Sequence, residues 1–234
     1  MNVVDKAKLI RQCMLMLDFK DSEIKELATY AQQVSMESGE FLFKSGDRPK
    51  NLYFVNEGIL KSIMHSPSGK DLVLSFYCAG DVIGEAAFFT GEPYASSALT
   101  VSASKLLLIP KEYFTSYIQN HPEVYVKTIN ILVRRIIMFQ YRLEDFAGAN
   151  ALQRLLRILI NLFEQFDGSV PLTKYSIADE AGLAPETTIR IMAHLEREGY
   201  IESSRGKVTL LDKDGLKELF SNAGELKSSL NMIK

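Results

Sequence analysis

The chain contains no tryptophan, two cysteines and three histidines, and it lacks a long uninterrupted apolar run. Because Cys13 and Cys78 are far apart in the sequence, they form neither a disulfide framework nor a zinc site, and two thiols argue against an iron–sulfur cluster. Arg134 and Arg135 interrupt the most apolar segment, so no stretch reaches the ~18 residues that a membrane helix needs. The charged N-terminus has no signal-peptide core. We therefore expect a cytoplasmic protein without a membrane partner.

Catalytic motifs are also missing. We find no nucleophile beside a base, no cluster of metal ligands and no phosphate-binding loop with its lysine. The sequence therefore predicts a protein that is not an enzyme and that has no dedicated metal site. Its 234 residues and 47% hydrophobic content suit two folded domains better than one.

The first half of the chain predicts a small barrel or rolled β-sandwich. Short runs rich in β-branched, aliphatic and aromatic residues occur at 41–43, 52–55, 59–64, 72–77 and 104–109. Glycine turns separate these runs, and many short strands at regular spacing are typical of closed β architecture, with no room for a long helix. A helical segment from about Val3 to Gln33, with Ser22 as a cap, precedes the strands.

A long helix is predicted from about His121 to Phe146. Its apolar residues alternate by four and three, which is the seam of a coiled coil: Tyr125, Ile129, Leu132, Ile136, Phe139, Leu143 and Phe146. The seam predicts a homodimer formed by two parallel helices, and the alternative is that it packs against its own β-domain. A second stripe formed by Val126, Val133 and Ile137 supplies enough apolar surface for both roles.

Residues 146–150 are the candidate hinge that follows this helix. Small residues and Gly148 permit the backbone to pivot, and Asn150 is a good cap for the next helix. A plain helix break without motion is the alternative.

Residues 172–201 predict a helix-turn-helix. Ile177, Ala178 and Ala181 in the first helix are spaced so that a second helix can cross it closely. Gly182 supplies the turn, and Pro185 takes the first helical position, where a missing N–H costs nothing.

The second helix has one apolar and one polar face. Its inward stripe consists of Thr188, Ile191, Met192 and Leu195. Glu186 and Arg190 lie one turn apart on the outer face, where a glutamate can accept from cytosine N4 and an arginine can bind guanine O6 and N7. The alternative is an ordinary ion pair on the helix surface.

The segment that follows predicts a wing. Residues 202–212 resemble two strands joined by a turn at Arg205–Gly206, and the basic Arg205 and Lys207 would lie near a phosphate backbone. Residues 148–234 carry eleven basic and twelve acidic residues. DNA binding therefore requires the basic residues to be segregated on one face.

The order of these parts resembles the CRP/FNR family of bacterial transcription regulators, over nearly the whole chain. The resemblance is carried by GEFLFKSGD at 39–47, LYFVNEGILK at 52–61, GDVIGE at 80–85 and APETTIRIMAHLEREGYI at 184–201. It implies an α+β fold with an N-terminal β-roll like a cyclic-nucleotide-binding jelly roll, a long dimerisation helix and a C-terminal winged helix-turn-helix. We expect the effector-sensing domain at 1–120, the dimerisation helix at 121–147 and the DNA-binding domain at 148–234.

The resemblance also implies DNA contacts. Glu186 and Arg190 would read a TGA-like core and Thr187 would touch phosphate, whereas Ile189 departs from the serine or glycine usual in the family. Pro185 replaces an arginine that cyclic-AMP-responsive members use for a base contact, so the chain is more similar to the FNR and nitric-oxide-responsive branches. The predicted DNA-binding residues are Thr173, Pro185, Glu186, Thr187, Arg190, Arg205 and Lys207.

The effector segment departs from the cyclic-nucleotide binders of this family. In those proteins a loop after a Gly-Glu pair presents N–H groups and an arginine to the phosphate, and the glutamate takes a ribose hydroxyl. Gly84 and Glu85 are present here, but Tyr94 or a neighbour replaces the arginine, and no Arg or Lys lies between Asp81 and Leu99. A buried phosphate needs such donors, so the sequence argues against cyclic AMP. The predicted effector-pocket residues are Gly84, Glu85, Phe88, Phe89, Tyr94, Ser96 and Ser97.

Other signals are left as alternatives. Haem could use His65, His121 or a methionine as an axial ligand, and a small organic effector could occupy an aromatic-lined pocket. We expect a transcription regulator that binds a palindromic DNA site as a homodimer, has RNA polymerase as a further partner, and responds to an effector, redox or gas signal. The alternative is a signalling module whose C-terminal domain docks a protein partner, which would show no salt-sensitive DNA affinity.

Overall fold

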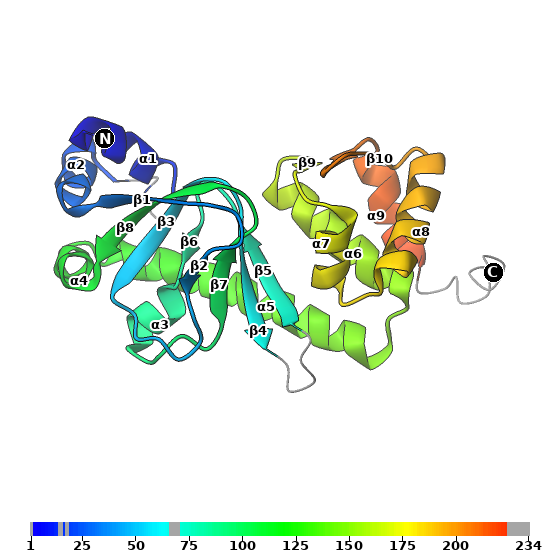
Figure 1. Cartoon of the computed structure of the whole chain (residues 1–234), viewed down its shortest axis with the longest axis horizontal. Helices are drawn as coiled ribbons and strands as arrows, with labels where there is room; N and C mark the ends of the chain where they lie inside the picture. The colour runs from blue at the N-terminus through cyan, green and yellow to red at the C-terminus, as the bar shows by residue number, and fades with distance from the viewer. Residues whose placement is uncertain (1, 14–15, 17–18, 66–70, 224–234) are drawn as a thin grey trace. The chain divides into compact units, whose positions relative to one another are not determined.

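The computed structural model describes residues 2–13, 16, 19–65 and 71–223, apart from the side chains of Phe146 and Ala147 (Figure 1). The chain forms two compact units, Met1–Ile136 and Ile137–Lys234, with the boundary inside one long helix. No helix within the described ranges is long and apolar enough to span a membrane. One of the predicted glycine turns, at residues 68–70 between the runs 59–64 and 72–77, lies outside those ranges.

The N-terminal segment of the first unit forms two helices, α1 (Val3–Arg11) and α2 (Asp21–Tyr30), and not one helix up to Gln33. Gln33 instead lies in strand β1 (Gln32–Met36). The predicted cap at Ser22 is wrong because α2 already begins at Asp21, which places Ser22 inside the helix. Lys20 is the N-cap residue, and its backbone N–H donates to Glu23 Oε2 at 2.8 Å. The side chain of Glu23 thereby satisfies a free N–H at the helix start.

The β-roll consists of two four-stranded antiparallel sheets, with strand orders β1-β8-β3-β6 and β2-β7-β4-β5. The strands predicted from the sequence are confirmed as β2 (Phe41–Phe43), β3 (Asn51–Glu57), β4 (Leu60–His65), β5 (Asp71–Tyr77) and β8 (Ser104–Pro110). The strands β1, β6 (Val82–Ile83) and β7 (Ser97–Thr100) were not predicted. They are short or polar, so they lack the apolar alternation that identifies a strand.

The first sheet contributes side chains to two cores. Along β3, Leu52 and Phe54 pack with the N-terminal helices and with α4 (Lys111–Gln119), whereas Tyr53 and Val55 point into the space between the sheets. Successive side chains of a strand alternate between faces, so one strand serves two cores. The short helix α3 (Glu85–Thr90) follows β6 in the same unit.

Helix α5 (Glu123–Gly148) begins in this unit and packs on the core through Val124 and Ile131, with Thr128 buried between them. Val126, Val133 and Ile137 are exposed. The second apolar stripe therefore does not supply the surface that covers the roll. The face opposite that stripe covers it, because the helix turns about 100° per residue and Val124, Thr128 and Ile131 share that face.

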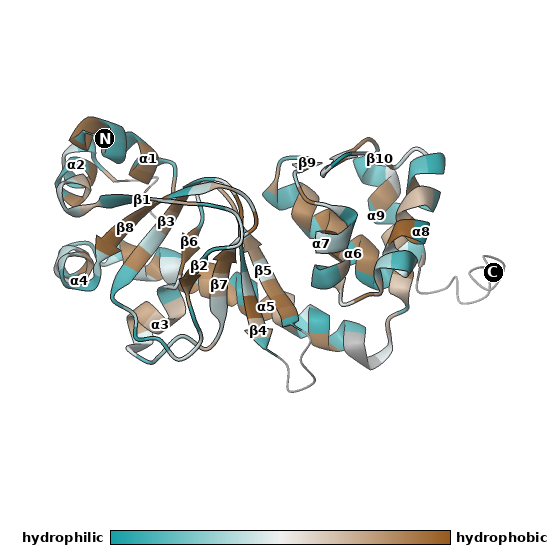
Figure 2. Ribbon diagram, viewed as in Figure 1, coloured by the Kyte–Doolittle hydropathy of each residue, from teal (hydrophilic) through white to brown (hydrophobic). Residues whose placement is uncertain are grey.

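The second unit is a winged helix-turn-helix that α6 (Ala151–Gln165) supports. Figure 2 shows hydrophobic residues along α6, where Leu155, Leu156 and Leu159 are fully buried. The remaining elements are β9 (Ser169–Val170), α7 (Lys174–Ala181), α8 (Pro185–Arg197), β10 (Ile201–Ser204), β11 (Lys207–Leu210) and α9 (Lys213–Asn222). The sheet order is β10-β11-β9, so the predicted hairpin gains a third strand.

Candidate nucleic-acid interface

A close crossing positions helix α8, as the sequence predicts. Ala178 and Ala181 of α7 are buried, and Gly182 adopts φ 61° at the end of α7, a left-handed conformation that glycine accepts without strain. The N–H of Leu183 donates to Ala178 O at 3.0 Å, which closes the turn. Pro185 is the first residue of α8.

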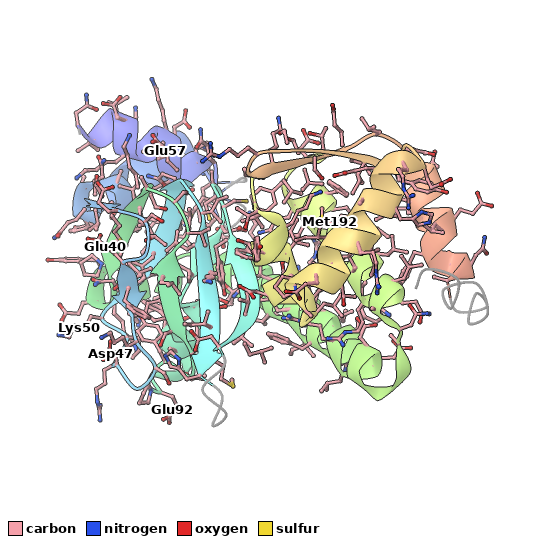
Figure 3. The ribbon with its side chains drawn as sticks, turned by 45° about the vertical axis from the view of Figure 1, so that its right-hand side comes forward. Glu40, Asp47, Lys50, Glu57, Glu92 and Met192 are labelled. Atoms are coloured by element: carbon pink, nitrogen blue, oxygen red, sulfur yellow. The ribbon has the colours of Figure 1, made fainter. Side chains whose placement is uncertain are left out.

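Helix α8 buries the predicted apolar stripe and exposes the predicted polar face. The buried residues are Thr188, Ile191, Met192 and Leu195 (Met192 is labelled in Figure 3). Glu186, Ile189 and Arg190 are exposed. Among the described residues no ion pair joins Glu186 to Arg190, so both side chains can reach an external ligand.

Arg190 borders a groove of ≈ 200 Å³ between α8 and the start of α6. Thr187 and His194 line the same groove, together with Asn150 and Ala151. The first amides of a helix favour anions because they have no intrahelical acceptor. The sequence does not predict that the start of α6 lies beside the DNA-reading residues, because these segments are distant in the chain and only the fold brings them together.

Thr173 and the wing supply further polar and basic side chains in the unit that contains α8. Thr173 is exposed and caps α7, its Oγ1 accepting from the Ser176 N–H at 3.1 Å. Arg205 and Lys207 are exposed at the β10–β11 turn, where Gly206 has φ 74°. Neither basic residue forms an ion pair within the described part of the chain.

Buried charges connect the end of α5 and α6 to the helix-turn-helix. Arg142 donates to the Glu180 carbonyl, and Arg154 donates to the carbonyls of Ala181 and Gly182 at 2.7 and 2.9 Å. Burial raises the pKa of the Glu180 carboxyl to about 7, and the nearby Arg142 opposes that rise. The orientation of the turn before α8 therefore depends on these two guanidinium groups.

The candidate hinge contains the predicted cap. Helix α5 ends at Gly148, and Asn150 Oδ1 accepts from the Gln153 N–H at 2.9 Å, while Gln153 Oε1 accepts from the Asn150 N–H at 3.0 Å. This reciprocal pair is a capping box, so the cap at Asn150 is confirmed. Pivoting at Gly148 stays a prediction.

The predicted seam of α5 forms an exposed apolar face. Leu132 is half-buried, and the other described seam residues are exposed, with Leu143 at 69% and Ile136 at 55% of their full accessibility. Val126 and Val133 widen this face. An apolar face of this length is typical of a surface that a partner covers.

The effector segment is centred on a buried ion pair. Gly84 has φ 89° and precedes α3, and the Glu85 side chain is only 3% exposed. Arg135 of α5 pairs with Glu85 through Nη1 and donates from Nη2 to Val82 O at 3.2 Å. Its guanidinium lies 5.0 Å from the centroid of the Tyr77 ring. The glutamate that would take a ribose hydroxyl in the family's cyclic-nucleotide binders is thus paired with the long helix.

The predicted pocket residues divide between two cores. Tyr94 lies beside Gly84 and stacks on Phe43 with ring centroids 3.7 Å apart, in the core between the sheets. Phe88 instead packs in the other core, which the N-terminal helices cover, and Phe89 lies 6.0 Å from the ring of Tyr125 on α5.

The two predicted serines of the effector segment lie on the following strand or just before it. Ser97 Oγ accepts from the Ser45 N–H at 2.9 Å, and Ser96 is half-buried. Burial raises the pKa of the Tyr94 phenol well above its ordinary value, and no partner for its hydroxyl is found in the described ranges.

This end of the roll carries charges of both signs. The Tyr94 N–H donates to Asp47 O at 2.9 Å, and Lys111 Nζ lies 5.5 Å from the centroid of the Phe88 ring. Arg135, the guanidinium that reaches the segment, is already paired with Glu85. Within the described residues, the segment itself therefore supplies no unpaired guanidinium to an added anion.

The candidate haem ligands have other partners. His65 Nδ1 lies 2.6 Å from Asp71 Oδ1. His121 stacks on Tyr117, with ring centroids 4.3 Å apart. Within the ranges that the structure covers, no group of three or more His, Cys, Asp or Glu residues is arranged to hold a metal ion.

Comparison with known proteins agrees with this architecture. Residues 33–121 match the model of the cyclic nucleotide-binding domain, and residues 153–219 match that of the Crp-like helix-turn-helix domain. The chain is 27% identical over 228 residues to the fumarate and nitrate reduction regulatory protein of Vibrio cholerae, covering 93% of this chain and 90% of that protein.

Two further relatives show the same arrangement. A CRP-like cAMP-activated global transcriptional regulator of Mycobacterium tuberculosis is 25% identical over 203 residues, covering 83% of this chain and 91% of that protein. The crystal structure of a CRP/FNR-family transcriptional regulator from Thermus thermophilus is 26% identical, has a TM-score of 0.59 and covers 81% of this chain and 98% of that chain.

A cyclic-nucleotide-binding-like roll followed by a Crp-like helix-turn-helix defines a class of DNA-binding bacterial transcription regulator. The chain belongs to the CRP/FNR family of these regulators.

Proposed function

We propose that the protein binds a palindromic DNA site with a TGA-like core as a homodimer and changes its DNA affinity in response to a signal sensed in the β-roll. The observation that carries this proposal is the exposed apolar face of α5 on the same chain as an exposed reading helix. Two such helices related by a two-fold axis would enter successive major grooves, about 34 Å apart.

The face of α5 supports a second copy of this chain as its partner. Ile129, Ile136 and Leu143 recur with heptad spacing and are exposed, so a parallel copy of the helix could cover them. An identical helix presents an identical seam, and this self-complementarity is what a two-fold symmetric interface requires.

The DNA contacts follow from exposure and position. Glu186 and Arg190 project from α8 with no ion pair between them and would read base edges. Thr187, Thr173, Arg205 and Lys207 would contact phosphates, with Pro185 fixing the start of the reading helix. A DNA-binding regulator of this kind acts in the bacterial cytoplasm, with RNA polymerase as its further partner.

The signal is proposed to differ from a cyclic nucleotide bound in the family's manner. No Arg or Lys lies between Asp81 and Leu99, and Glu85 is engaged by Arg135. Among the described residues, the segment itself therefore offers a buried phosphate no unpaired arginine or lysine. A small apolar effector suits the apolar surroundings of Tyr94 or of Phe89 better than an anion does, and a redox or gas signal is the alternative.

The Glu85–Arg135 pair supports the route by which such a signal would act. It ties the start of α3 to the helix that carries the apolar face. A signal that displaces α3 would break a buried ion pair, which is costly, or would carry α5 with it. Gly148, at the end of α5, would then change the orientation of the reading helices.

Fluorescence anisotropy with a labelled palindromic duplex tests the proposed function. We expect saturable binding that weakens steeply as the salt concentration rises. Protein binding releases cations from the DNA phosphates, and this release becomes less favourable at high salt. A duplex with both TGA-like cores scrambled is the matched control. A module that docks a protein partner would bind neither duplex, and that outcome would contradict the proposal.

A further inference from the structure

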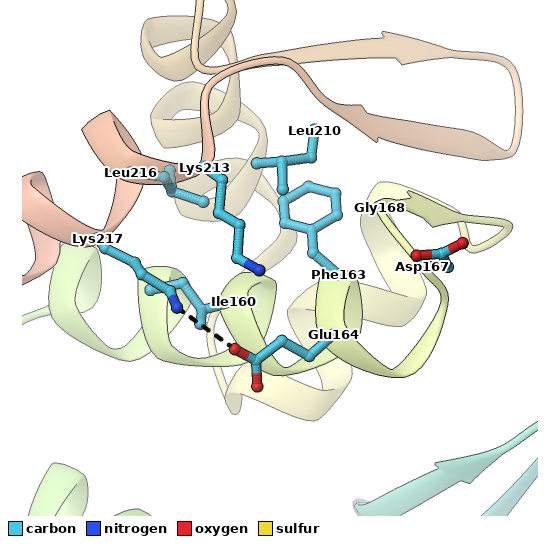
Figure 4. A pocket seen from close by; sticks show the side chains of 9 residues that line it. All are labelled: Ile160, Phe163, Glu164, Asp167, Gly168, Leu210, Lys213, Leu216 and Lys217. Atoms are coloured by element: carbon cyan, nitrogen blue, oxygen red, sulfur yellow. Dashed lines mark ion pairs between the residues drawn. The ribbon is translucent and has the colours of Figure 1, made fainter.

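A pocket in the second unit has no role in the DNA contacts described above. It lies between α6, β11 and α9, and its volume is ≈ 490 Å³ (Figure 4). We name it the α6–α9 pocket. This volume lies within the range of small-molecule sites, which is roughly 300–1,000 Å³.

The wall of the α6–α9 pocket is apolar and firmly held. Phe163 and Leu216 line it and are nearly fully buried, so their positions are fixed by the core behind them. Ile160 and Leu210 complete the apolar wall and are half-buried. A ligand with a branched or aromatic body would remove the exposed part of these side chains from water, which is favourable.

One ammonium group faces this wall. Figure 4 shows the Lys213 side chain extending toward Ile160 and Phe163. Lys213 has neither an ion pair nor a hydrogen bond in the described part of the chain. Lys217, on the next turn of α9, lies 3.6 Å from Glu164 Oε1, and both side chains of this pair are about half exposed. Lys213 is therefore the cation available to a ligand.

The charges restrict the chemistry of the ligand. A single carboxylate could accept from Lys213 while its apolar body covers Phe163 and Leu216. Glu164 and Asp167 also border the pocket and would repel a multiply charged anion such as a nucleotide. We propose that the α6–α9 pocket binds a small monocarboxylate with a branched or aromatic body.

Such a ligand would touch the wing directly. Leu210 belongs to β11 and pairs with Ile201 of β10, and its N–H donates to Gly168 O at 2.9 Å on the opposite side. Asp167, before that glycine, has φ 49° and is the non-glycine residue with a left-handed backbone in the described ranges. A ligand bound in the α6–α9 pocket would thus stiffen β11, the strand that carries Lys207. Through this strand the ligand would change the affinity for DNA.

Methyl NMR of the full chain tests the proposal with phenylacetate and 4-methylpentanoate as probes. We expect saturable shifts of the Leu210 and Leu216 methyl signals below about 10 mM, a concentration that detects millimolar affinity. Phenylacetamide has the same shape without the charge. It should bind roughly tenfold more weakly, because it cannot form the charge-assisted hydrogen bond.

Lys213→Gln should weaken both carboxylates by a similar factor, roughly tenfold. Lys25→Gln, at an exposed site on α2 in the other unit, is the matched control and should leave binding unchanged. Lys213 is exposed, so the variant is expected to fold. No saturable shift with either carboxylate, equal binding of the amide, or unchanged binding in Lys213→Gln would overturn the proposal. DNA affinity is measured separately, so a failure here leaves the proposed DNA function standing.

Discussion

Arg190 and Glu186 lie one turn apart on the exposed side of α8, while buried residues such as Thr188 and Ile191 anchor the helix. The sequence predicts this division of faces. A helix repeats every 3.6 residues, so apolar residues at that spacing form the buried face and the polar residues between them form the exposed face. The sequence could not show that Arg190 lies beside the start of α6. That proximity joins segments that are distant in the chain.

Arg190→Ala should reduce affinity for the preferred site by about 1–3 kcal/mol and relax discrimination at one guanine, because a bidentate contact is lost. Competition binding with duplexes varied at each position measures both effects. Arg197→Ala, at the exposed end of the same helix, is the control and should change neither. Unchanged selectivity in Arg190→Ala would show that this residue does not read a base.

Glu180 gives the second unit a pH-dependent stability. Burial raises its pKa from 4.5 to about 7, so the folded state holds this proton more tightly than the unfolded state does. Between these two pH values the folded state binds more protons, and stability therefore falls as pH rises through that window. Arg142, Asp145 and Arg154 surround the same small cavity.

Glu180→Gln removes this titration, since glutamine stays neutral like the protonated carboxyl. We expect the variant to gain stability relative to the wild type as pH rises from about 5 to about 8. Thermal unfolding followed by circular dichroism at several pH values measures this difference. A difference that is constant over the window would mean that Glu180 titrates normally.

The elements differ in how far the sequence reveals them. Long periodic segments such as α5, and strands with apolar cores such as β3 and β8, are evident from the pattern alone. The short strands β1 and β9 are polar or only two residues long, and they exist because a neighbouring strand supplies hydrogen bonds. Tertiary pairing of this kind leaves no local signal.

The sequence does not show which face of α5 covers the roll, and the apolar Val126, Val133 and Ile137 are exposed. Arg135 explains part of this difficulty. A charged residue is expected on the outer face of a helix, but Arg135 faces the interior of the unit, where it forms an ion pair with Glu85. The sequence around Arg135 does not reveal this partner, because Glu85 lies 50 residues away in the chain.

Charged residues at Leu132 and Ile136 should separate the proposed dimer. Leu132→Lys combined with Ile136→Lys places like charges opposite each other in the seam, so we expect monomers by sedimentation velocity. Asn130→Lys adds a charge to an exposed position of α5 outside the seam and should leave the dimer intact. A dimer that survives the double substitution would mean that another surface joins the chains.

At the scale of the whole molecule, each unit supplies one part of a regulator. The first unit contains an acidic effector segment whose Glu85 is tied to α5, and the second contains a reading helix, a wing and the α6–α9 pocket. The order of these parts in the sequence identifies the family, but it does not identify the effector. The lack of Arg or Lys between Asp81 and Leu99 changes the chemistry of this segment without changing the roll.

We propose that two chains read one palindrome together. Sedimentation of the protein on a labelled duplex tests this, using two TGA-like half-sites whose centres are about one helical turn apart. We predict two chains per duplex, and a loss of binding when about half a turn of DNA is inserted between the half-sites. One chain per duplex, or equal affinity for both spacings, would contradict the account.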